Sequence, residues 1–121
     1  MSLWTFGTIA EEPEVRLVHW RVLEASYVGT ALPPTRHFVG ADSGDRTGRV
    51  SSAILELDIG ARRGLTESGR AYGLIGKPGH DSNAEHVWNM WCRINAVAKW
   101  IDATRDAFAA PGEETTVRDG T

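Results

Sequence analysis

Residues 82–108 constrain the fold more than any other stretch, because they combine three of the five tryptophans with a helical spacing of apolar residues. Ser82 and Glu85 have the spacing of a capping box, which satisfies backbone donors at a helix start. We therefore predict one helix over residues 83–106, capped by Ser82. At about 100° per residue, its core face is a single arc. That arc contains Val87, Met90, Trp91, Ile94, Val97, Ala98, Ile101 and Phe108.

Two large indoles, Trp88 and Trp100, lie outside this arc on opposite flanks of the predicted helix. Tryptophan is enriched among interface hot spots and also lines apolar ligand pockets. Both are therefore candidate binding residues, together with Trp4 near the N-terminus. The alternative is that the sheet rim, or an N-terminal arm carrying Trp4 and Phe6, simply covers them.

The residues before the helix predict an antiparallel sheet. Alternation of apolar and polar side chains predicts strands over residues 15–25, 35–40, 49–58, 62–67 and 70–76. Val18, Trp20 and Val22 share one face of the first strand, and Ser68-Gly69 suits a two-residue hairpin turn. Short connections favour a meander. The predicted core contains Trp20, Val22, Leu55, Leu57, Trp91, Ile94 and Ile101.

The predicted fold class is thus α+β, with about five antiparallel strands in a meander-like order packed against one long C-terminal helix. We expect one domain over residues 1–108. The polar segment 109–121 is expected to be a flexible C-terminal tail.

Composition narrows the classes of function. The net charge of −3 disfavours a general binder of the nucleic-acid backbone, so nucleic acid is an unlikely partner. The single cysteine, Cys92, cannot form an intramolecular disulfide, which favours a cytoplasmic protein. The first residues lack the basic region of a signal peptide. No apolar run reaches the roughly 20 residues that a membrane span needs, so we expect no membrane partner.

Arginines at predicted strand ends and turns are the main charged candidates. Arg36, Arg49, Arg63 and Arg70, with neighbouring Arg62, would gather along one rim of a meander. Arginine recognises carboxylate and phosphate groups with two parallel hydrogen bonds. The alternative is ordinary solubilising charge, neutralised by nearby acidic residues.

No catalytic signature stands out. His80, Asp81 and His86 are close in sequence and are the best metal candidate, but surface loop residues explain them more simply. No serine has the G-x-S-x-G setting of a hydrolase, and Cys92 fits a packing role. We therefore predict no catalytic residue, no metal and no cofactor, and favour a non-enzymatic protein.

Several short motifs carry a resemblance. They are Arg-His-Phe-Val-Gly (36–40), Gly-Arg-Val-Ser-Ser-Ala-Ile (48–54), Thr-x-Ser-Gly-Arg-x-Tyr (66–72), Gly-x-Pro-Gly (76–79) and Val-Trp-x-x-Trp (87–91). This set resembles a group of short bacterial proteins to which no activity is attached. The resemblance implies a bacterial or mobile-element origin and assigns no residue a role.

The leading functional expectation is a small cytoplasmic interaction or regulatory module that binds a protein partner. A homodimer through an edge strand or a helix flank, with Trp88 or Trp100 near the interface, is one form of that partner. The alternative is a small-ligand-binding domain or minor enzyme with its pocket between helix and sheet. A nucleic-acid-associated protein using the arginine rim is a weaker alternative.

Overall fold

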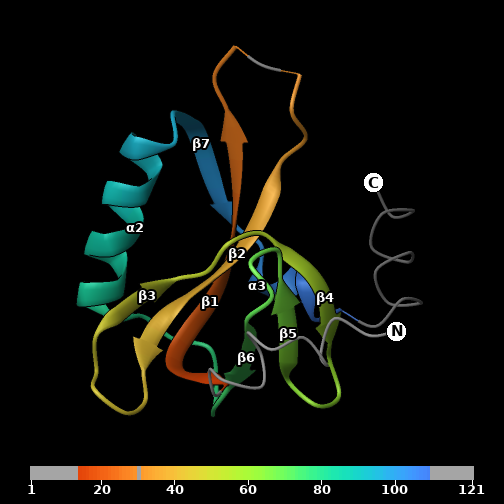
Figure 1. Ribbon diagram of the computed structural model, residues 1–121, viewed down its shortest axis with the longest axis vertical. Coiled ribbons are helices and arrows are strands. Elements are labelled where there is room, and N and C mark those ends of the chain that lie inside the picture. The colour runs from red at the N-terminus through yellow and green to blue at the C-terminus, as the bar shows by residue number, and fades with distance from the viewer. Residues whose placement is uncertain (1–13, 30, 110–121) are drawn as a thin grey trace.

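The computed structural model describes residues 14–29 and 31–109, which form a curled sheet with two short helices (Figure 1). Trp4, Phe6 and the predicted tail beyond Ala109 lie outside the described residues. The elements in chain order are β1 (Val15–Tyr27), β2 (Thr35–Asp42), β3 (Gly48–Val50), β4 (Ile54–Asp58), β5 (Arg63–Thr66), β6 (Ala71–Leu74), α2 (Ser82–Ile94), β7 (Val97–Asp102) and α3 (Thr104–Ala107).

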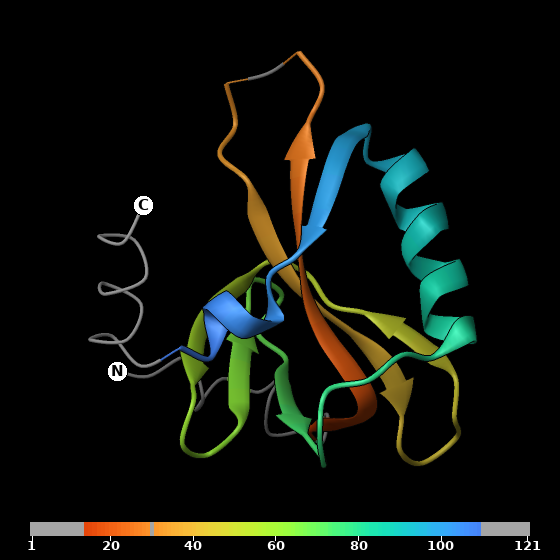
Figure 2. The same cartoon turned by 180° about the vertical axis from the view of Figure 1, so that it is seen from behind.

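The described strands form one mixed sheet in the order β3-β2-β1-β6-β5-β4, and β7 also pairs with β1. Neighbouring strands are antiparallel except β1 and β6, which run parallel. β3 and β4 lie at opposite ends of this order, yet residues 51–53 join them directly, so the sheet curls on itself (Figures 1 and 2). The described sheet has seven strands, not the predicted five or so. Without β7, and with β3 and β4 counted as one interrupted strand, the remaining strands form a meander of five that closes through β1 and β6. An odd number of alternating strands leaves the first and last parallel. The prediction of a purely antiparallel sheet was therefore wrong.

β1 holds two regions of the molecule together because it is long enough to serve three partners. One edge pairs with β2, while the other pairs with β6 near Leu17 and with β7 from Leu23 onward. The register with β2 shifts between Val18 and Arg21. Such a bulge bends a strand and changes which face a side chain takes. Leu17 before it and Val22 after it consequently reach the same buried cluster.

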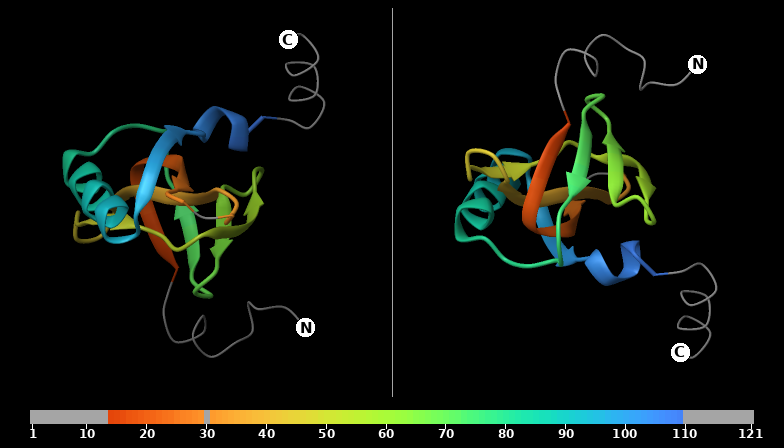
Figure 3. Two further views of the ribbon diagram at one scale, coloured as in Figure 1. Left: turned by 90° about the horizontal axis from the view of Figure 1, so that it is seen from above. Right: turned by 90° about the horizontal axis from the view of Figure 1, so that it is seen from below.

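The buried side chains form two clusters on either side of the β1–β2 hairpin. The first fills the curled sheet and contains Val15, Leu17, Trp20, Val22, Phe38, Tyr72, Leu74 and Ala103. The second lies beneath α2 and contains Leu23, Ala25, Val39, Ala84 and Trp88. Figure 3 shows α2 on the flank of the sheet away from α3. The helix covers one part of the sheet, while the curled strands enclose the rest of the core.

The single long C-terminal helix predicted over residues 83–106 is wrong. α2 ends at Ile94, and Ala96 takes a left-handed backbone conformation with φ of 55°. The side-chain amide of Asn95 donates to the Trp91 carbonyl and helps to end the helix. Residues 97–102 then pair with β1, whose edge beyond Leu23 requires hydrogen-bond partners. Helical spacing continued past Ile94 by coincidence, and strand pairing determined the structure.

The predicted core face of that helix is also wrong. Met90, Ile94 and Ile101 are exposed, whereas Trp88, predicted to lie off the core, is completely buried. α2 buries only Ala84 and Trp88 fully. The helix is thus held by a narrow contact rather than by a broad apolar face.

The wider core prediction was right for β1 and failed, wholly or in part, for β4 and for residues 91–101. Trp20 and Val22 are buried as predicted. Leu55 is exposed at the position where the β4–β5 register shifts, and Leu57 and Trp91 are only partly buried. The failure follows from the helix error and from the curl of the sheet, which leaves one face of β4 toward solvent.

The helix cap also differs from the prediction. Asp81, not Ser82, is the N-cap, and its carboxylate accepts the Ala84 backbone N–H at 2.9 Å. Glu85 pairs with His80 instead of closing a capping box. Ser82 and Asp81 are both good capping residues, and the extended backbone of Asp81 (φ −133°, ψ 124°) fits the role.

The strand prediction located β1, β2, β5 and β6, missed β7 and overlooked one interruption. The segment predicted as a strand over 49–58 divides into β3 and β4 at residues 51–53. Ser51 is buried there, where its hydroxyl accepts the Phe38 N–H and donates to the Ser52 carbonyl. The predicted turn at Ser68-Gly69 joins β5 to β6, with Gly69 at φ of 91°.

Candidate interaction surface

β7 presents an open edge. It pairs only with β1 within the described part of the chain, in a register that runs from Leu23 opposite Asp102 to Tyr27 opposite Val97. Residues 98–102 are all exposed. Figure 2 shows β7 running along the upper part of β1. An uncovered strand edge is a template for pairing with another chain.

The backbone ladder indicates which groups of β7 face outward. The Ala103 N–H donates to the Val22 carbonyl at 2.8 Å. Hydrogen bonding alternates along an antiparallel pair, so in this register Ile101 and Lys99 bond toward β1. The N–H and carbonyl of Trp100 then point away from β1. These outward groups are the ones available to an added strand.

Exposed apolar side chains surround this edge. Ile94 at the end of α2 is 78% exposed and Val28, directly after β1, is 58% exposed. The Val28 N–H donates to the Ala96 carbonyl at 3.2 Å. This bond links the end of the β1 segment to the connection between α2 and β7. On β7, Ile101 is 54% exposed and Trp100 is 36% exposed. We call Val28, Ile94 and β7 the edge surface.

A stack of aromatic rings supports the edge surface from below. Trp88 and Trp91 are stacked with centroids 5.2 Å apart and planes 9° apart. Trp100 meets Trp88 at a right angle, with centroids 5.9 Å apart. Trp88, a predicted binding residue, therefore lies beneath the edge surface, whereas Trp100 lies at this surface. Trp4 lies outside the described residues.

The indole N–H of Trp88 is the one buried side-chain polar atom without a hydrogen-bond partner among residues 14–29 and 31–109. Trp20, the other fully buried tryptophan, donates its N–H to the carbonyls of Ile75 and Gly76. A buried donor without a partner costs free energy. The unpaired N–H of Trp88 therefore offsets part of the stability that burial of the apolar ring contributes.

His37 connects the hairpin to this aromatic stack. Its ring lies 4.5 Å from Trp91, its Nδ1 lies 2.9 Å from the Ser51 carbonyl and its Nε2 lies 2.7 Å from the Thr35 hydroxyl. Because the carbonyl only accepts, Nδ1 donates, and in the neutral ring Nε2 accepts from Thr35. Tyr27 in turn donates to the Thr35 oxygen. Burial lowers the pKa of His37, consistent with this neutral, fully bonded form.

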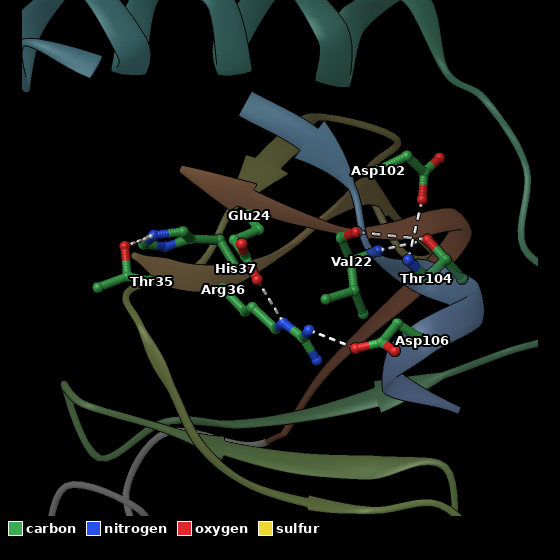
Figure 4. Close-up of polar contacts among 8 residues, drawn as sticks. All are labelled: Val22, Glu24, Thr35, Arg36, His37, Asp102, Thr104 and Asp106. Carbon is green, nitrogen blue, oxygen red and sulfur yellow. Dashed lines mark hydrogen bonds and ion pairs between the residues drawn. The ribbon is translucent and has the colours of Figure 1, made fainter. Parts of the chain in front are cut away.

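On the opposite face of the hairpin, Arg36 is held between two carboxylates (Figure 4). Its Nε donates to Glu24 at 2.9 Å and an Nη donates to Asp106 at 2.6 Å. Burial lowers the pKa of Arg36, but the hydrogen bonds and charges of the two carboxylates together outweigh that effect. The pKa of Arg36 is therefore raised. These contacts also tie α3 to the hairpin, where the Thr104 hydroxyl accepts the Val22 N–H at 2.9 Å.

Arg36 lines a cleft of about 580 Å³ between the hairpin, β4 and α3. Apolar side chains of Val22, Leu55 and Ala107 share this cleft with Glu24 and Glu67. The predicted pocket between the long helix and the sheet is not the cleft observed, because that helix does not exist. The observed cleft combines an apolar floor with net negative charge.

The other predicted arginines lie on separate elements. Arg49 pairs with Asp42 and Arg63 pairs with Glu14. Arg70 lies beside the hydroxyl of Tyr72, whose pKa burial raises despite the nearby guanidinium. The positive charge of Arg36, Arg49 and Arg63 is therefore balanced locally by a carboxylate.

The segment around His80, Asp81 and His86 has a structural role at the start of α2. Asp81 caps the helix and His80 pairs with Glu85. Among the described residues, no three histidine, cysteine, aspartate or glutamate side chains converge in a way that would hold a metal ion. No helix of this part of the chain has the length and apolar character to cross a bilayer.

Sequence reasoning missed the edge surface because it assigned residues 97–102 to a helix. A signal was present, since Asn95 is a common helix terminator and Val97, Trp100 and Ile101 favour strands. Ile94 and Val28 gave no signal, because an isolated exposed apolar residue is ordinary in a sequence.

Comparisons with protein-family models, with curated proteins and with solved structures give no match to this chain. The function must therefore be inferred from the geometry of its own residues.

Proposed function

We propose that this protein is a small interaction module that binds protein at the edge of β7. The single observation that carries the proposal is the run of exposed residues 98–102 on a strand whose outer edge is open within the described chain. An extended segment that adds to such an edge gains main-chain hydrogen bonds. Specificity then comes from side chains beside the edge.

The surroundings of the edge support this function. Ile94 and Val28 place apolar surface at one end of β7, and Trp100 lies on the side that α2 covers. Aromatic residues at the centre of an interface supply much of its binding energy. The stack of Trp88 and Trp91 beneath Trp100 restricts the motion of that ring, which lowers the entropy lost on binding.

Lys99 argues for selectivity at this edge. Natural edge strands use lysine to discourage indiscriminate pairing. Lys99 disfavours pairing with a strand that places a basic residue directly opposite it. A strand with a complementary residue at that position can still pair. The module that we propose is therefore selective for its partner.

Small-ligand binding is the second candidate, and the cleft beside Arg36 favours it. The cleft has a volume in the range of ligand sites, and Glu24, Arg36 and Leu55 are among the residues that line it. Both carboxylate contacts of Arg36 are already formed within the chain, so an anionic ligand would have to displace them. This makes the cleft a weaker basis for function than the open edge.

Cytoplasmic location and a bacterial or mobile-element origin belong to the same proposal. The lone Cys92 supports a reducing compartment. Burial also raises the pKa of its thiol, so the thiol stays protonated and poorly reactive. A regulatory adaptor without redox chemistry fits these properties.

Photo-cross-linking tests the proposal directly. A photoreactive phenylalanine derivative would replace Lys99 on β7, and in a control would replace exposed Leu55 on β4. We expect a protein adduct from position 99 and none from position 55. Adducts of equal yield from both positions, or none from either, would contradict a docking role for β7.

A proline variant makes the same test specific for strand addition. Ala98 is the extra residue where the β1–β7 register shifts, and proline is tolerated at bulges and edges. Ala98→Pro removes one backbone N–H from β7 and adds a ring to this strand, whereas the matched control Ala98→Ser keeps the N–H. The adduct from position 99 should be lost in the proline variant and retained in the serine variant.

A further inference from the structure

We propose that the partner at the edge of β7 is a second copy of this chain, paired antiparallel about a twofold axis with Trp100 opposite Trp100 of the partner subunit. This inference rests on the proposed function and names the occupant of the same edge. The geometry of β7 and the placement of its charges support it.

The backbone limits the registers that two copies can adopt. The groups of Trp100 point away from β1, as do those of Asp102, so the residues with outward groups must meet one another. In a twofold antiparallel pair, this rule also places the α2-covered faces of the two β7 strands on the same side of the joined sheet. Both α2 helices therefore lie on that side. Registers shifted by a single residue are therefore excluded.

Among the remaining registers, two pair the greatest length of β7 with β7 of the second copy. One places Lys99 directly opposite Lys99 of the partner subunit, and like charges in that position are destabilising. The other places Trp100 opposite Trp100 of the partner subunit, and Lys99 opposite Ile101 of the partner subunit. Charge therefore selects the register centred on Trp100.

The selected register also matches the surrounding side chains. Asp102 falls opposite Ala98 of the partner subunit, so no like charges face one another across the strands. Trp100 contacts Trp88 at a right angle, so a second indole would extend the existing aromatic stack across the twofold axis. The stem of Lys99 would cover exposed Ile101 of the partner subunit.

Disulfide trapping measures the register. In a Cys92→Ser background, the single variants Trp100→Cys, Lys99→Cys and Ile101→Cys would be oxidised under mild conditions. Directly opposed residues in an antiparallel pair have Cα atoms about 4.5–5.5 Å apart, within the range that a disulfide spans. We expect Trp100→Cys to cross-link with itself.

A mixture of the other two variants keeps Trp100 intact. We expect Lys99→Cys and Ile101→Cys to form mainly mixed disulfides with each other, because these positions face one another. A dominant self-cross-link of Lys99→Cys or of Ile101→Cys would overturn the register. Ala98→Pro should abolish the cross-links, and Ala98→Ser should retain them.

Light scattering at micromolar concentration separates this inference from the proposed function. A dimer mass that Ala98→Pro converts to a monomer mass supports both. A monomer mass, with position 99 photo-cross-linked to a different protein, overturns the second copy and leaves the interaction module standing. A monomer mass with no adduct at position 99 overturns both.

Discussion

Replacing each of the two fully buried tryptophans with phenylalanine gives a direct test of the side-chain packing. Trp88 is 0% exposed and Trp20 is 1% exposed, so both changes remove a similar buried volume. The Trp20 N–H donates to the Ile75 and Gly76 carbonyls at 3.2 and 3.3 Å. The Trp88 N–H has no partner among the described residues. The difference between the two costs therefore isolates the effect of the N–H group.

The expected difference follows from the hydrogen bonds. Trp20→Phe loses a net contribution of about 1 kcal/mol, whereas Trp88→Phe removes an unpaired donor that costs about 1–3 kcal/mol. Trp88→Phe should therefore destabilise the protein by about 2–4 kcal/mol less than Trp20→Phe. Urea denaturation followed by far-ultraviolet circular dichroism measures both values, because neither variant then depends on tryptophan fluorescence.

The alanine variants provide the control. Trp88→Ala and Trp20→Ala should each cost about 3–5 kcal/mol, because both leave a large cavity. If Trp88→Phe proved as costly as Trp20→Phe, the Trp88 N–H would have a partner and the reasoning would be refuted.

Three further predictions concern single residues. Asp81→Ala should lower the free energy of unfolding by about 1 kcal/mol, and Ser82→Ala should barely change it; the reverse order in a urea titration would return the cap to Ser82. Because burial lowers the pKa of His37 below its ordinary value of 6.5, the unfolded chain binds more protons in mildly acidic solution. The free energy of unfolding should thus be fully retained above about pH 6.5 and fall as the pH drops below it. His37→Gln should flatten this dependence, and an unchanged slope would contradict a neutral buried imidazole. Cys92→Ser should leave the melting temperature and the mass nearly unchanged, since the thiol is half-buried and protonated; loss of binding in that variant would require a reactive thiol.

Part of the sheet was predictable because the signals of its individual strands and turns are local. Alternation marks β1 and β2, and Ser68-Gly69 marks the turn between β5 and β6. Neither the bulge after Val18 nor the inward turn of Ser51 has a comparable signal. Both depend on strands that are distant in sequence. Closure of the sheet through β1 and β6 depends on long-range pairing in the same way.

The helix prediction failed because one apolar pattern fitted two structures. Beyond Ile94, the spacing of Val97 and Ile101 suits a helix, while their side chains also suit a strand. The choice was made by the exposed edge of β1, which the local sequence does not reveal. The same error concealed the candidate site. Trp100 was selected as an indole on a helix flank, and it lies instead on a strand whose outer edge pairs with no other described strand.

The most direct measurement of the central proposal is amide hydrogen exchange along β7. Ile101 bonds toward β1, so its amide should exchange slowly whether the chain is isolated or assembled. The outward amide of Trp100 should exchange rapidly in the isolated chain. It should slow at the protein or partner concentration at which the measured mass increases. A Trp100 amide that exchanges as rapidly in the assembled protein as in the isolated chain would contradict binding at the edge of β7.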